Sequence, residues 1–230
     1  MEAYKREFIE FLQSAGVLKF GDFTAKSGRK IPYFVNAGMI KTGDQISKLG
    51  EFYAKAYFDK LGKKEAVLYG PAYKGIPLSI SAAVALSKNG LDVPFFFNRK
   101  EAKDHGGDAG LLLGSSIKEG DKIVIIEDVT TSGKSIEETF PIIKAQCPNP
   151  DKIEIKGLMV SLNRQEKGKG EKSALEEITD LYGFPANAIV TMSEVVEYLY
   201  NKPTGKDGKI IIDDKIKTDI ENYYKEYGAK

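Results

Sequence analysis

Two acidic residues, Glu127 and Asp128, follow an unbroken apolar run in the stretch KIVIIEDVTTSGKS, residues 122–135. The apolar run predicts a buried strand, and the acids then lie at its carboxyl end, where open α/β sheets bind ligands. The small and hydroxylated residues that follow, with Gly133 among them, offer backbone N–H groups and hydroxyls for a phosphate. Adjacent carboxylates bind phosphate poorly but suit sugar hydroxyls or a cation such as Mg²⁺. The stretch therefore predicts a site for a ribose phosphate.

Two other interpretations fit part of this stretch. The letters GKS at residues 133–135 also occur in the nucleotide-binding P-loop, but that motif needs a glycine five residues before Gly133, and Asp128 stands there. An acidic, threonine-rich cap on an ordinary helix is the other alternative, and the local pattern alone leaves it open.

A second stretch that is rich in potential ligand-binding residues is FNRKEAKDHG, residues 97–106. Four cationic side chains fall within seven residues, at Arg99, Lys100, Lys103 and His105. Arginine can bind phosphate oxygens in a bidentate manner and lysine binds them as a point charge, so the cluster suits a pyrophosphate. Glycines follow at 106, 107 and 110, which is typical of a mobile lid. A solvated surface loop with a basic bias is the alternative.

The composition is that of a globular protein and narrows the classes of function. The chain has 230 residues, and its 34 basic and 33 acidic residues give a net charge of +1, which argues against a dedicated nucleic-acid binder. Cys147 is the only cysteine, which excludes an intrachain disulfide and fits a reducing compartment. The N-terminus lacks the apolar core of a signal peptide, and no run reaches the roughly 18 apolar residues of a membrane span. These features predict a cytoplasmic protein that binds neither membranes nor nucleic acid.

The positions of apolar residues predict alternating strands and helices. Short apolar runs typical of strands lie at 66–70, 93–97, 122–128, 153–162 and 187–192. Helical spacing appears at 2–15, 44–61, 75–89, 133–146 and 173–182, and Pro141 is expected to kink or shorten the fourth of these helices. Loops are expected at 98–110 and 202–209, the second as a peripheral hairpin or extension before a final helix to Tyr227. The alternation predicts an α/β fold with a mainly parallel central sheet flanked by helices.

Several of these stretches carry a resemblance to a known family. The apolar run, the acid pair and VTTSGKS resemble the phosphoribosyl pyrophosphate motif of type I phosphoribosyltransferases. Four further stretches are similar to orotate phosphoribosyltransferases within that family: LKFGDFTAKSGRKIPYFVNAG at 18–38, GPAYKGIPL at 70–78, FNRKEAKDHG at 97–106 and SLNRQEKG at 161–168. The resemblance runs from about residue 4 to 200. It implies the type I phosphoribosyltransferase fold as a single domain over 1–230, in which about 1–40 contribute to a substrate-binding hood and 202–230 form a C-terminal extension.

The resemblance implies an enzyme, a glycosyltransferase of the pentosyltransferase class that acts in UMP synthesis. It would transfer ribose 5-phosphate from 5-phosphoribosyl 1-pyrophosphate to orotate with the help of Mg²⁺, giving orotidine 5′-monophosphate and pyrophosphate. It further implies a homodimer in which the loop 98–110 covers the neighbouring subunit's site. Two alternatives stay open: a regulator that keeps the fold and binds phosphoribosyl pyrophosphate without catalysis, and a purine-type phosphoribosyltransferase. The balanced charge argues against the regulator, and the stretch 97–106 together with Arg164 argues against the purine-type enzyme.

The resemblance also assigns roles to individual residues. Phosphoribosyl pyrophosphate is expected to contact Tyr73, Lys74, Arg99, Lys100, Lys103, His105, Glu127, Asp128, Val129, Thr130, Thr131, Ser132, Gly133, Lys134 and Ser135. Orotate is expected to contact Lys26, Phe34, Val35, Thr131 and Arg164. Catalytic roles fall to Lys103, His105 and Asp128. Mg²⁺ is expected to be held mainly by the substrate pyrophosphate, so no residue is assigned as a certain metal ligand.

Three positions depart from the family pattern. Val35 stands where a second aromatic residue is common, so ring stacking from that position is lost. Glu127 stands where the first of two aspartates is common, and its longer side chain can still reach ribose hydroxyls. The sequence HGGDAG at 105–110 replaces the usual spacing of glutamate and glycine after the lid histidine, which predicts altered mobility of the lid.

Three of the resembling stretches also fit plainer structures. The family has a cis peptide before the position of Tyr73, whereas the sequence GPAYKG alone fits an ordinary turn equally well. The stretch around Phe34 fits a plain hairpin with a phenylalanine in its core. Arg164 follows an apolar run and could grip the orotate carboxylate in a bidentate manner, but it fits a surface ion pair with Glu166 as well.

Overall fold

The computed structural model describes residues 1–230 except 26–27, 104–109, 131–133, 148 and 206, and it describes residues 101–103, 110 and 134 through their backbone alone. Its centre is a sheet of six strands: β3 (Val67–Gly70), β4 (Phe95–Lys103), β5 (Gly110–Gly114), β6 (Lys122–Ile126), β7 (Glu154–Asn163) and β8 (Ala186–Thr191). They lie in the order β5-β4-β3-β6-β7-β8, and all neighbours are parallel except β4 and β5. The predicted mainly parallel sheet is confirmed, and the antiparallel edge strand β5 is an addition to it.

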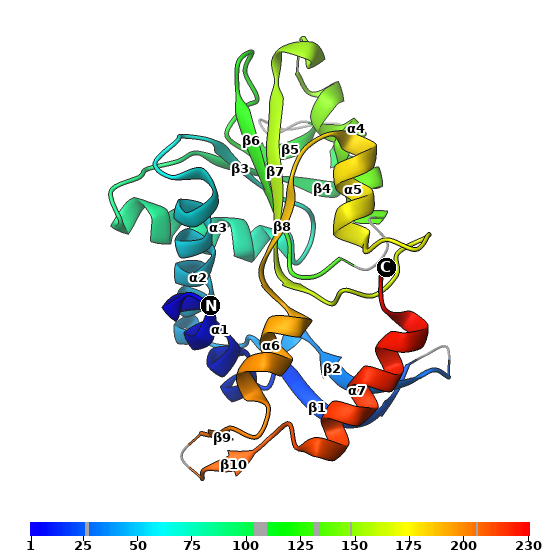
Figure 1. Ribbon diagram of the computed structural model, residues 1–230. Coiled ribbons are helices and arrows are strands. Elements are labelled where there is room, and N and C mark those ends of the chain that lie inside the picture. The colour runs from blue at the N-terminus through cyan, green and yellow to red at the C-terminus, as the bar shows by residue number, and fades with distance from the viewer. Residues whose placement is uncertain (26–27, 104–109, 131–133, 148, 206) are drawn as a thin grey trace.

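Helices cover both faces of this sheet (Figure 1). One face carries α2 (Gly43–Leu61) and α3 (Gly75–Lys88), and the other carries α4 (Lys134–Ala145) and α5 (Ala174–Tyr182). Successive strand residues point to opposite faces, so Leu68 and Val124 join the core under α2 and α3. Tyr69 and Ile125 join the second core, under α4 and α5. Because both faces are buried, the central strands are apolar throughout, which is why their positions could be predicted.

A second group of elements lies largely below the sheet in Figure 1 and comes from both ends of the chain. Its members are α1 (Ala3–Ser14), β1 (Leu18–Thr24), β2 (Lys30–Val35), the 3-10 turn η1 (Ala37–Met39), α6 (Met192–Leu199), β9 (Pro203–Thr204), β10 (Lys209–Ile210) and α7 (Asp214–Tyr227). Strands β1 and β2 pair antiparallel, and α7 packs on β2. Lys5 on α1 forms an ion pair with Glu194 on α6 at 2.8 Å, which joins the two ends of the chain. We call this group of elements the hood.

The helix that contains Pro141 covers nearly the whole of the range 133–146 in which a helix was expected. Helix α4 continues through the proline to Ala145, so the expected shortening is wrong, whereas the alternative effect, a kink, stays a prediction. Ile136 before the proline and Ile143 after it are both fully buried against the sheet. Burial of an apolar face supplies most of the stability of a helix in a protein, and here it outweighs the backbone hydrogen bond that proline cannot make.

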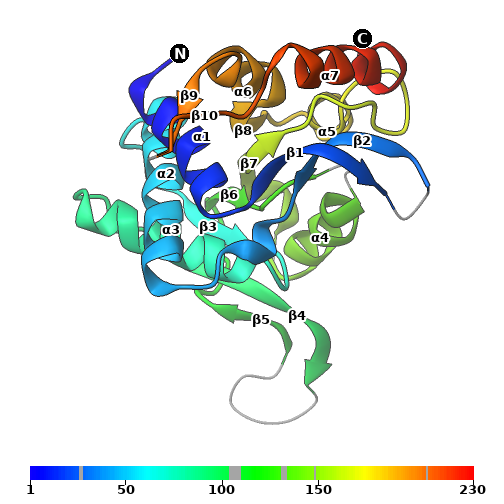
Figure 2. The same ribbon diagram turned by 90° about the horizontal axis from the view of Figure 1, so that it is seen from below.

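The expected loop 98–110 is strand at both of its ends. Strand β4 extends to Lys103 and β5 begins at Gly110, with an irregular register between Asn98 and Lys103. The two strands project beyond the rest of the molecule (Figure 2). A polar sequence is compatible with strand here, because an antiparallel pair at the edge of a sheet does not need two buried faces. The apolar pattern could therefore not indicate it.

The C-terminal part of the chain agrees with its expected outline. Strands β9 and β10 form the small antiparallel hairpin expected around 202–209, and α7 ends at Tyr227 as expected. Helix α6 was not predicted, because its eight residues directly follow β8 without a break in the apolar pattern. A further 3-10 turn, η2 (Pro150–Lys152), precedes β7.

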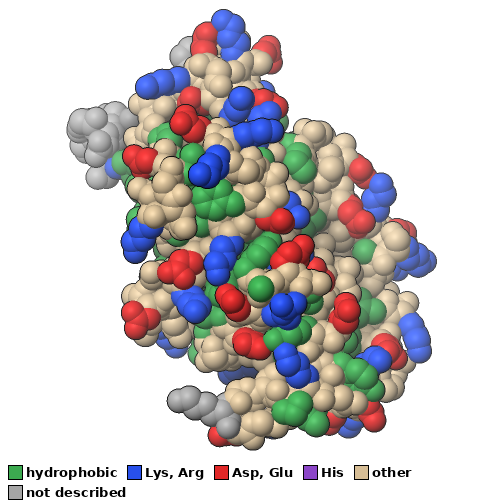
Figure 3. Space-filling view, turned by 60° about the vertical axis from the view of Figure 1, so that its left-hand side comes forward, with side chains coloured by type: hydrophobic (Ala, Val, Ile, Leu, Met, Phe, Trp, Pro, Cys, Tyr) green, Lys and Arg blue, Asp and Glu red, His purple; other side chains and the backbone are tan. Residues whose placement is uncertain are grey.

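The surface mixes charges of both signs. On the face in Figure 3, lysine and arginine side chains alternate with aspartate and glutamate, and small hydrophobic patches lie between them. This distribution agrees with a net charge of +1. Among the described residues, no helix is both long enough and apolar enough to cross a membrane.

Candidate active site

The acid pair lies directly after β6, as predicted, and its backbone is fixed by the neighbouring strand. The N–H of Glu127 donates to the carbonyl of Met159 at 3.0 Å, and the carbonyl of Asp128 accepts from both the N–H and the hydroxyl of Ser161, at 2.8 and 2.6 Å. From the helix side, the hydroxyl of Tyr53 donates to the carbonyl of Glu127 at 2.5 Å. The two carboxylates are therefore attached to a backbone that is held from two elements.

The carboxylate of Glu127 is almost enclosed. Its residue is only 9% exposed, and the hydroxyl of Ser135 donates to it at 2.7 Å. Burial raises the pKa of Glu127 to about 7; the nearby carboxylate of Asp128 adds to this, while the hydrogen bond from Ser135 and the charge of Lys74 oppose it. The group is thus close to half-protonated near neutral pH. Ser135, expected as a phosphate contact, is also engaged with this acid.

The turn between β3 and α3 approaches the acid pair closely because it contains glycine. A Cβ atom on Gly75 would lie 2.6 Å from Cδ of Pro71 and 2.9 Å from the carbonyl oxygen of Ile126, the last residue of β6. Only glycine fits between these groups. The peptide between Ala72 and Tyr73 is cis, so this implication of the family resemblance is confirmed.

An ion pair joins the turn to the acids. Nζ of Lys74 lies 2.9 Å from Oδ2 of Asp128, with the lysine side chain 65% exposed and the aspartate side chain 17% exposed. Tyr73 is also exposed, and the ammonium of Lys100 lies 5.0 Å from the centre of its ring. A cavity of about 470 Å³ between α2 and α3 is lined in part by Lys74 and Asp128. Residues expected to bind phosphoribosyl pyrophosphate thus come together from three separate segments.

A residue that the sequence patterns missed holds two of these segments together. Asn98 is buried, and its Oδ1 accepts from the hydroxyl of Tyr69 at 2.8 Å and from the N–H of Ala72 at 2.9 Å. Its Nδ2 donates to the carbonyl of Arg99 at 3.0 Å. Asn98 therefore fixes the β3–α3 turn against the strand that carries Arg99 and Lys100. The available signal was a single amide directly after the apolar run VPFFF.

On the orotate side, Phe34 is presented to solvent rather than to the core. It is 46% exposed on β2, and its ring lies 5.6 Å from that of Phe23, in a stacked arrangement. The buried aromatic residue of this hairpin is its neighbour Tyr33. The plain alternative of a hairpin with Phe34 in its core is therefore wrong, because strand alternation buries Tyr33 in its place. Val35 pairs with Leu18 of β1.

Arg164 directly follows β7, as expected, and is largely buried. Its Nη2 lies 2.5 Å from Oε1 of Glu166, and its guanidinium lies 5.6 Å from the centre of the Tyr33 ring. Burial works against the charged form of Arg164, but the carboxylate of Glu166 outweighs it and raises the pKa further above its ordinary value. The ion pair with Glu166 that the sequence suggested is present. Nε of Arg164 is buried and has no hydrogen-bond partner among the described residues.

Some of the expected site residues cannot be compared with the structure. Five lie outside the described residues: Lys26, His105, Thr131, Ser132 and Gly133. Two more are described through their backbone alone: Lys103, which ends β4, and Lys134, which begins α4. Val129 and Thr130 follow the acid pair directly, on the side that leads to α4. The roles assigned to all of these residues stay predictions.

Comparison with known proteins identifies the family. The family model of the phosphoribosyl transferase domain matches residues 36–188. An orotate phosphoribosyltransferase of Clostridium botulinum strain Alaska E43 is 60% identical over the full length of both chains. One of Yersinia enterocolitica is 49% identical over 90% of this chain and 93% of its own length. The crystal structure of the orotate phosphoribosyltransferase of Francisella tularensis is 34% identical, covers 97% of this chain and all of its own, and superposes with a TM-score of 0.80.

The α/β fold, the acid pair and its loop, and these similarities define a phosphoribosyltransferase of type I. Within this class the chain belongs to the orotate phosphoribosyltransferases, and it is an enzyme of pyrimidine biosynthesis with the pentosyltransferase activity of that family. The resemblance inferred from five short stretches is thereby confirmed over the whole chain. The regulatory and purine-type alternatives find no support among these relatives.

Proposed function

We propose that phosphoribosyl pyrophosphate binds across the carboxyl ends of β3 and β6. Its ribose hydroxyls bind the carboxylates of Glu127 and Asp128, and its 5′-phosphate binds the backbone and hydroxyls of residues 129–135. Its pyrophosphate binds the turn at Tyr73 and Lys74. The ion pair of Lys74 with Asp128 at 2.9 Å carries this assignment, because it joins the two phosphate-binding motifs at one point. The substrate would replace it, with ribose hydroxyls on Asp128 and phosphate oxygens on Lys74.

Orotate is assigned to the hood side of the site. The exposed ring of Phe34 offers a face for the pyrimidine, and the backbone at Val35 offers hydrogen bonds to its polar edge. Arg164 pairs with the carboxylate of orotate, which its unpartnered buried Nε supports. Lys26 and Thr131 complete the contacts on the strength of the family resemblance.

The reaction makes electrostatic demands that these residues meet. The bond from a ring nitrogen of orotate to the anomeric carbon forms as the bond to the pyrophosphate oxygen breaks. The electron pair of the broken bond leaves with pyrophosphate, and the proton that the ring nitrogen carried passes to solvent. Positive charge develops on the sugar and negative charge on the leaving group. Arg99, Lys100, Lys103 and His105 stabilise the leaving pyrophosphate. The carboxylate of Asp128 lies on the sugar side, where it favours the developing cation. Exclusion of water from the sugar prevents hydrolysis.

The residues of this site fit a Mg²⁺ ion that binds together with the substrate. Among the described residues, no group of three or more histidine, cysteine, aspartate or glutamate side chains could hold a metal by itself. Mg²⁺ commonly binds through one or two carboxylates together with substrate phosphates, and Glu127 and Asp128 offer such carboxylates. When bound, the ion would neutralise charge on the pyrophosphate.

We further propose that the enzyme is a cytoplasmic homodimer. The free thiol of Cys147, the only cysteine, supports a reducing compartment. The projecting strands β4 and β5 support a contribution of the segment 98–110 to a neighbouring subunit, because they carry both ends of that segment away from their own sheet (Figure 2).

Mixed dimers test this arrangement. Lys103→Ala and Asp128→Asn are each expected to be nearly inactive alone. If Lys103 acts in the partner's site, a mixed dimer has one site with both changes and one site with neither. An equal mixture should then recover about one quarter of the wild-type rate, since half of the dimers are mixed and each has one intact site. No recovery after exchange of subunits, verified by native mass spectrometry, contradicts the shared site.

The substrate assignment is tested by the loss of orotate, followed by its ultraviolet absorbance with Mg²⁺ and phosphoribosyl pyrophosphate present. Adenine, hypoxanthine and uracil serve as parallel substrates, and Asp128→Asn serves as the inactive control. Consumption of orotate alone is the expected result. If no base reacts while phosphoribosyl pyrophosphate still binds in calorimetry, the sugar-phosphate site is retained but the catalytic proposal is wrong.

A further inference from the structure

The carboxylate of Glu166, in the loop between β7 and α5, is the centre of a buried network that joins this loop to the hood. Its Oε1 accepts from the hydroxyl of Tyr33 at 2.5 Å and from the guanidinium of Arg164 at 2.5 Å. Its Oε2 accepts from the guanidinium of Arg29 at 3.2 Å. The side chain is only 10% exposed. One carboxylate is therefore shared by two arginines and a tyrosine, and the group keeps an excess of one positive charge.

The two arginines of this network also keep hydrogen-bond donors that no described residue engages. Nε of Arg29 and Nε of Arg164 are both buried and have no hydrogen-bond partner among the described residues. A buried charged donor without a partner is unfavourable unless a ligand completes it. Two guanidiniums with spare donors and one surplus charge suit one anionic group, such as a single carboxylate.

Helix α7 closes this network from the C-terminal side. The hydroxyl of Tyr224 lies 3.1 Å from that of Tyr33, and it donates to the carbonyl of Arg164 itself. The guanidinium of Arg29 lies over the ring of Tyr227, at 4.7 Å from its centre. Arg164 is thus fixed at its carbonyl by α7 and at its guanidinium by Glu166.

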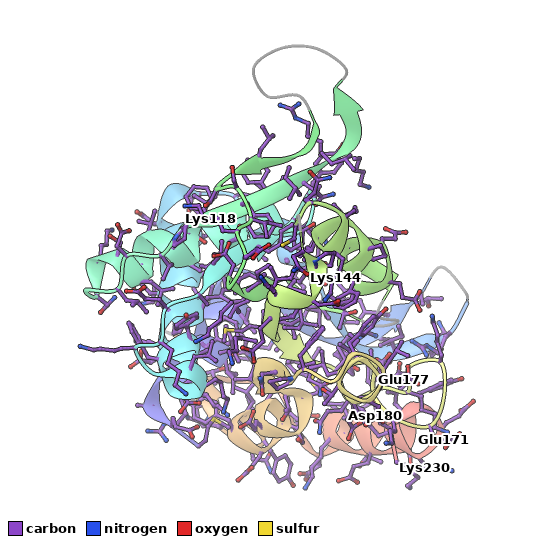
Figure 4. The ribbon with its side chains drawn as sticks, turned by 90° about the horizontal axis from the view of Figure 1, so that it is seen from above. Lys118, Lys144, Glu171, Glu177, Asp180 and Lys230 are labelled. Atoms are coloured by element: carbon purple, nitrogen blue, oxygen red, sulfur yellow. The ribbon has the colours of Figure 1, made fainter. Side chains whose placement is uncertain are left out.

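The chain after α7 is joined to the loop that carries Glu166. The N–H of Lys167 donates to the carbonyl of Tyr227, and the N–H of Ala229 donates to the carbonyl of Gln165, both at 2.9 Å. Nζ of Lys230 lies 3.0 Å from a carboxylate oxygen of Glu171, and Figure 4 shows these two side chains together beside the end of α7. The loop is therefore clamped along its length by the C-terminal segment.

The same loop is anchored to α5 on its other side. The carboxylate of Glu177, which lies on α5 in Figure 4, accepts from the N–H groups of Lys169 and Gly170 at 2.9 and 2.6 Å. A loop held from two helices restricts the positions that an arginine at its start can occupy. Such restriction lowers the entropy that is lost when a ligand binds.

We infer that Glu166 and Tyr224 are positioning residues that hold Arg164 ready for the carboxylate of orotate, so that the C-terminal helix takes part in choosing an anionic pyrimidine. This inference rests on the proposed function of Arg164 in orotate binding. Glu166 engages Nη2 and leaves Nε for the ligand, while Tyr224 fixes the backbone of the arginine. Neither residue needs to touch orotate.

The contrary view is that Glu166 competes with orotate for Arg164, since both are carboxylates. The two views predict opposite changes. Loss of a competitor lowers the KM for orotate, and loss of a positioning group raises it. Without Glu166 the guanidiniums of Arg29 and Arg164 also repel each other, which moves Arg164 away from its position.

Steady-state kinetics with both substrates distinguishes these views. Glu166→Gln is expected to raise the KM for orotate by roughly 10- to 100-fold, the effect of a charge-assisted hydrogen bond, and Tyr224→Phe by roughly 3- to 10-fold. The KM for phosphoribosyl pyrophosphate should stay within about twofold in both variants, because its site lies on the sheet. Glu221→Gln, an exposed change on α7 whose partner is Lys217, is the matched control and should change neither constant.

The same variants combined with Arg164→Ala complete the test. If Glu166 acts through Arg164, then Glu166→Gln changes nothing further once the arginine is gone. An orotate KM that is unchanged or lowered in both Glu166→Gln and Tyr224→Phe, while Arg164→Ala raises it, overturns the inference and leaves the proposed function intact. If Arg164→Ala itself leaves the orotate KM unchanged, the orotate assignment is wrong and the inference falls with it. Should Glu166→Gln fail to fold, Tyr224→Phe decides the question by the same criteria.

Discussion

The two halves of the active site are built in different ways. The sheet half, which we assign to phosphoribosyl pyrophosphate, uses backbone at the ends of buried strands, a close glycine turn and two carboxylates. The hood half, which we assign to orotate, uses side chains that reach across long distances in the sequence. Tyr33 and Glu166 are separated by 133 residues, and Tyr33 and Tyr224 by 191. Each motif of the first half is local in the sequence, whereas the contacts of the second half join residues that are far apart in the sequence.

This difference predicts which kinetic constant a substitution in each half should change. On the sheet side, a change of charge at the acids or the cations acts directly on the sugar or the leaving group. On the hood side, several side chains share the task of holding one arginine, so single changes should affect the affinity for one substrate. Changes on the two sides should therefore separate in kcat and in the two KM values.

The largest effect is expected at Lys103. Lys103→Ala removes a cation from the leaving pyrophosphate and should lower kcat roughly 100- to 1000-fold, the effect of losing one preorganised electrostatic group. The melting temperature should stay within about 2 °C of the wild type, as is usual for a change at a polar, projecting strand. Orotate absorbance at saturating substrates measures the rate. Lys118→Ala, at an exposed site, is the control, and a near-normal rate for Lys103→Ala would remove that residue from the chemistry.

The free energy of unfolding should depend on pH because of Glu127, which lies in the sheet half. The pKa of Glu127 is raised from 4.5 to about 7 when the chain folds, so the folded state holds this proton more tightly. The stability that this group contributes is complete below pH 4.5 and is lost as the pH rises through about 7. Urea unfolding should show a loss of about 3 kcal/mol over this range that is absent in Glu127→Gln. Parallel curves for the two proteins would show that folding does not raise the pKa of Glu127.

The affinity for phosphoribosyl pyrophosphate should depend on Asp128. Asp128→Asn keeps the shape of the side chain but removes the charge that faces Lys74, and it should weaken binding roughly 10- to 100-fold in calorimetry. Asp92→Asn, an exposed change before β4, is the matched control. Unchanged affinity would refute the assignment of ribose to the acid pair.

Alanine substitutions at two glycines test whether the turn between β3 and α3 must approach β6 closely. Gly75→Ala places a methyl group against Pro71 and the end of β6, and it should destabilise the protein by about 1–3 kcal/mol. Gly43→Ala lies at the first position of α2 with open space around it, and it should change stability by about 1 kcal/mol or less. Urea unfolding of both variants checks the contrast, and equal effects would show that the close approach of the turn is not required.

The smallest effect is expected at Phe34. Phe34→Ala removes an aromatic face and should raise the KM for orotate about 3- to 10-fold. Because the side chain is half-exposed, the melting temperature should hardly change. The KM for phosphoribosyl pyrophosphate is the internal control. A rise in that constant as large as the rise for orotate would contradict the division of the site into two halves.

The sheet half could be predicted from the sequence because its signals are local. Buried parallel strands are continuous apolar runs, so the ends of β3 and β6 were visible, and with them the positions of Lys74 and Asp128. The end of β7 likewise indicated the position of Arg164 on the hood side. The turn and the acid pair each lie within a few residues. Their contact depends on which strands are neighbours in the sheet, and the structure shows it as the ion pair at 2.9 Å.

The hood half could not be predicted in the same way. The apolar letters IPYFV do not reveal which of Tyr33 and Phe34 faces inward, and the structure buries Tyr33. Glu166 was suggested as a partner of Arg164, but not as the partner of Tyr33 and Arg29, because those contacts depend on tertiary structure. On the sheet side, Asn98 likewise gave no signal beyond its type, since the sequence does not show which buried donors an amide will meet.

The construction of the hood from both ends of the chain has a consequence for the order of folding. During synthesis β1 and β2 leave the ribosome before α7, the helix that covers them, which follows every other described element in the chain. Contacts between residues so far apart in sequence form slowly, because a long loop must close first. Tyr33 and its neighbours are therefore expected to stay accessible to solvent until α7 packs on β2. The orotate side of the site, as proposed, is therefore expected to be complete only once α7 has packed on β2.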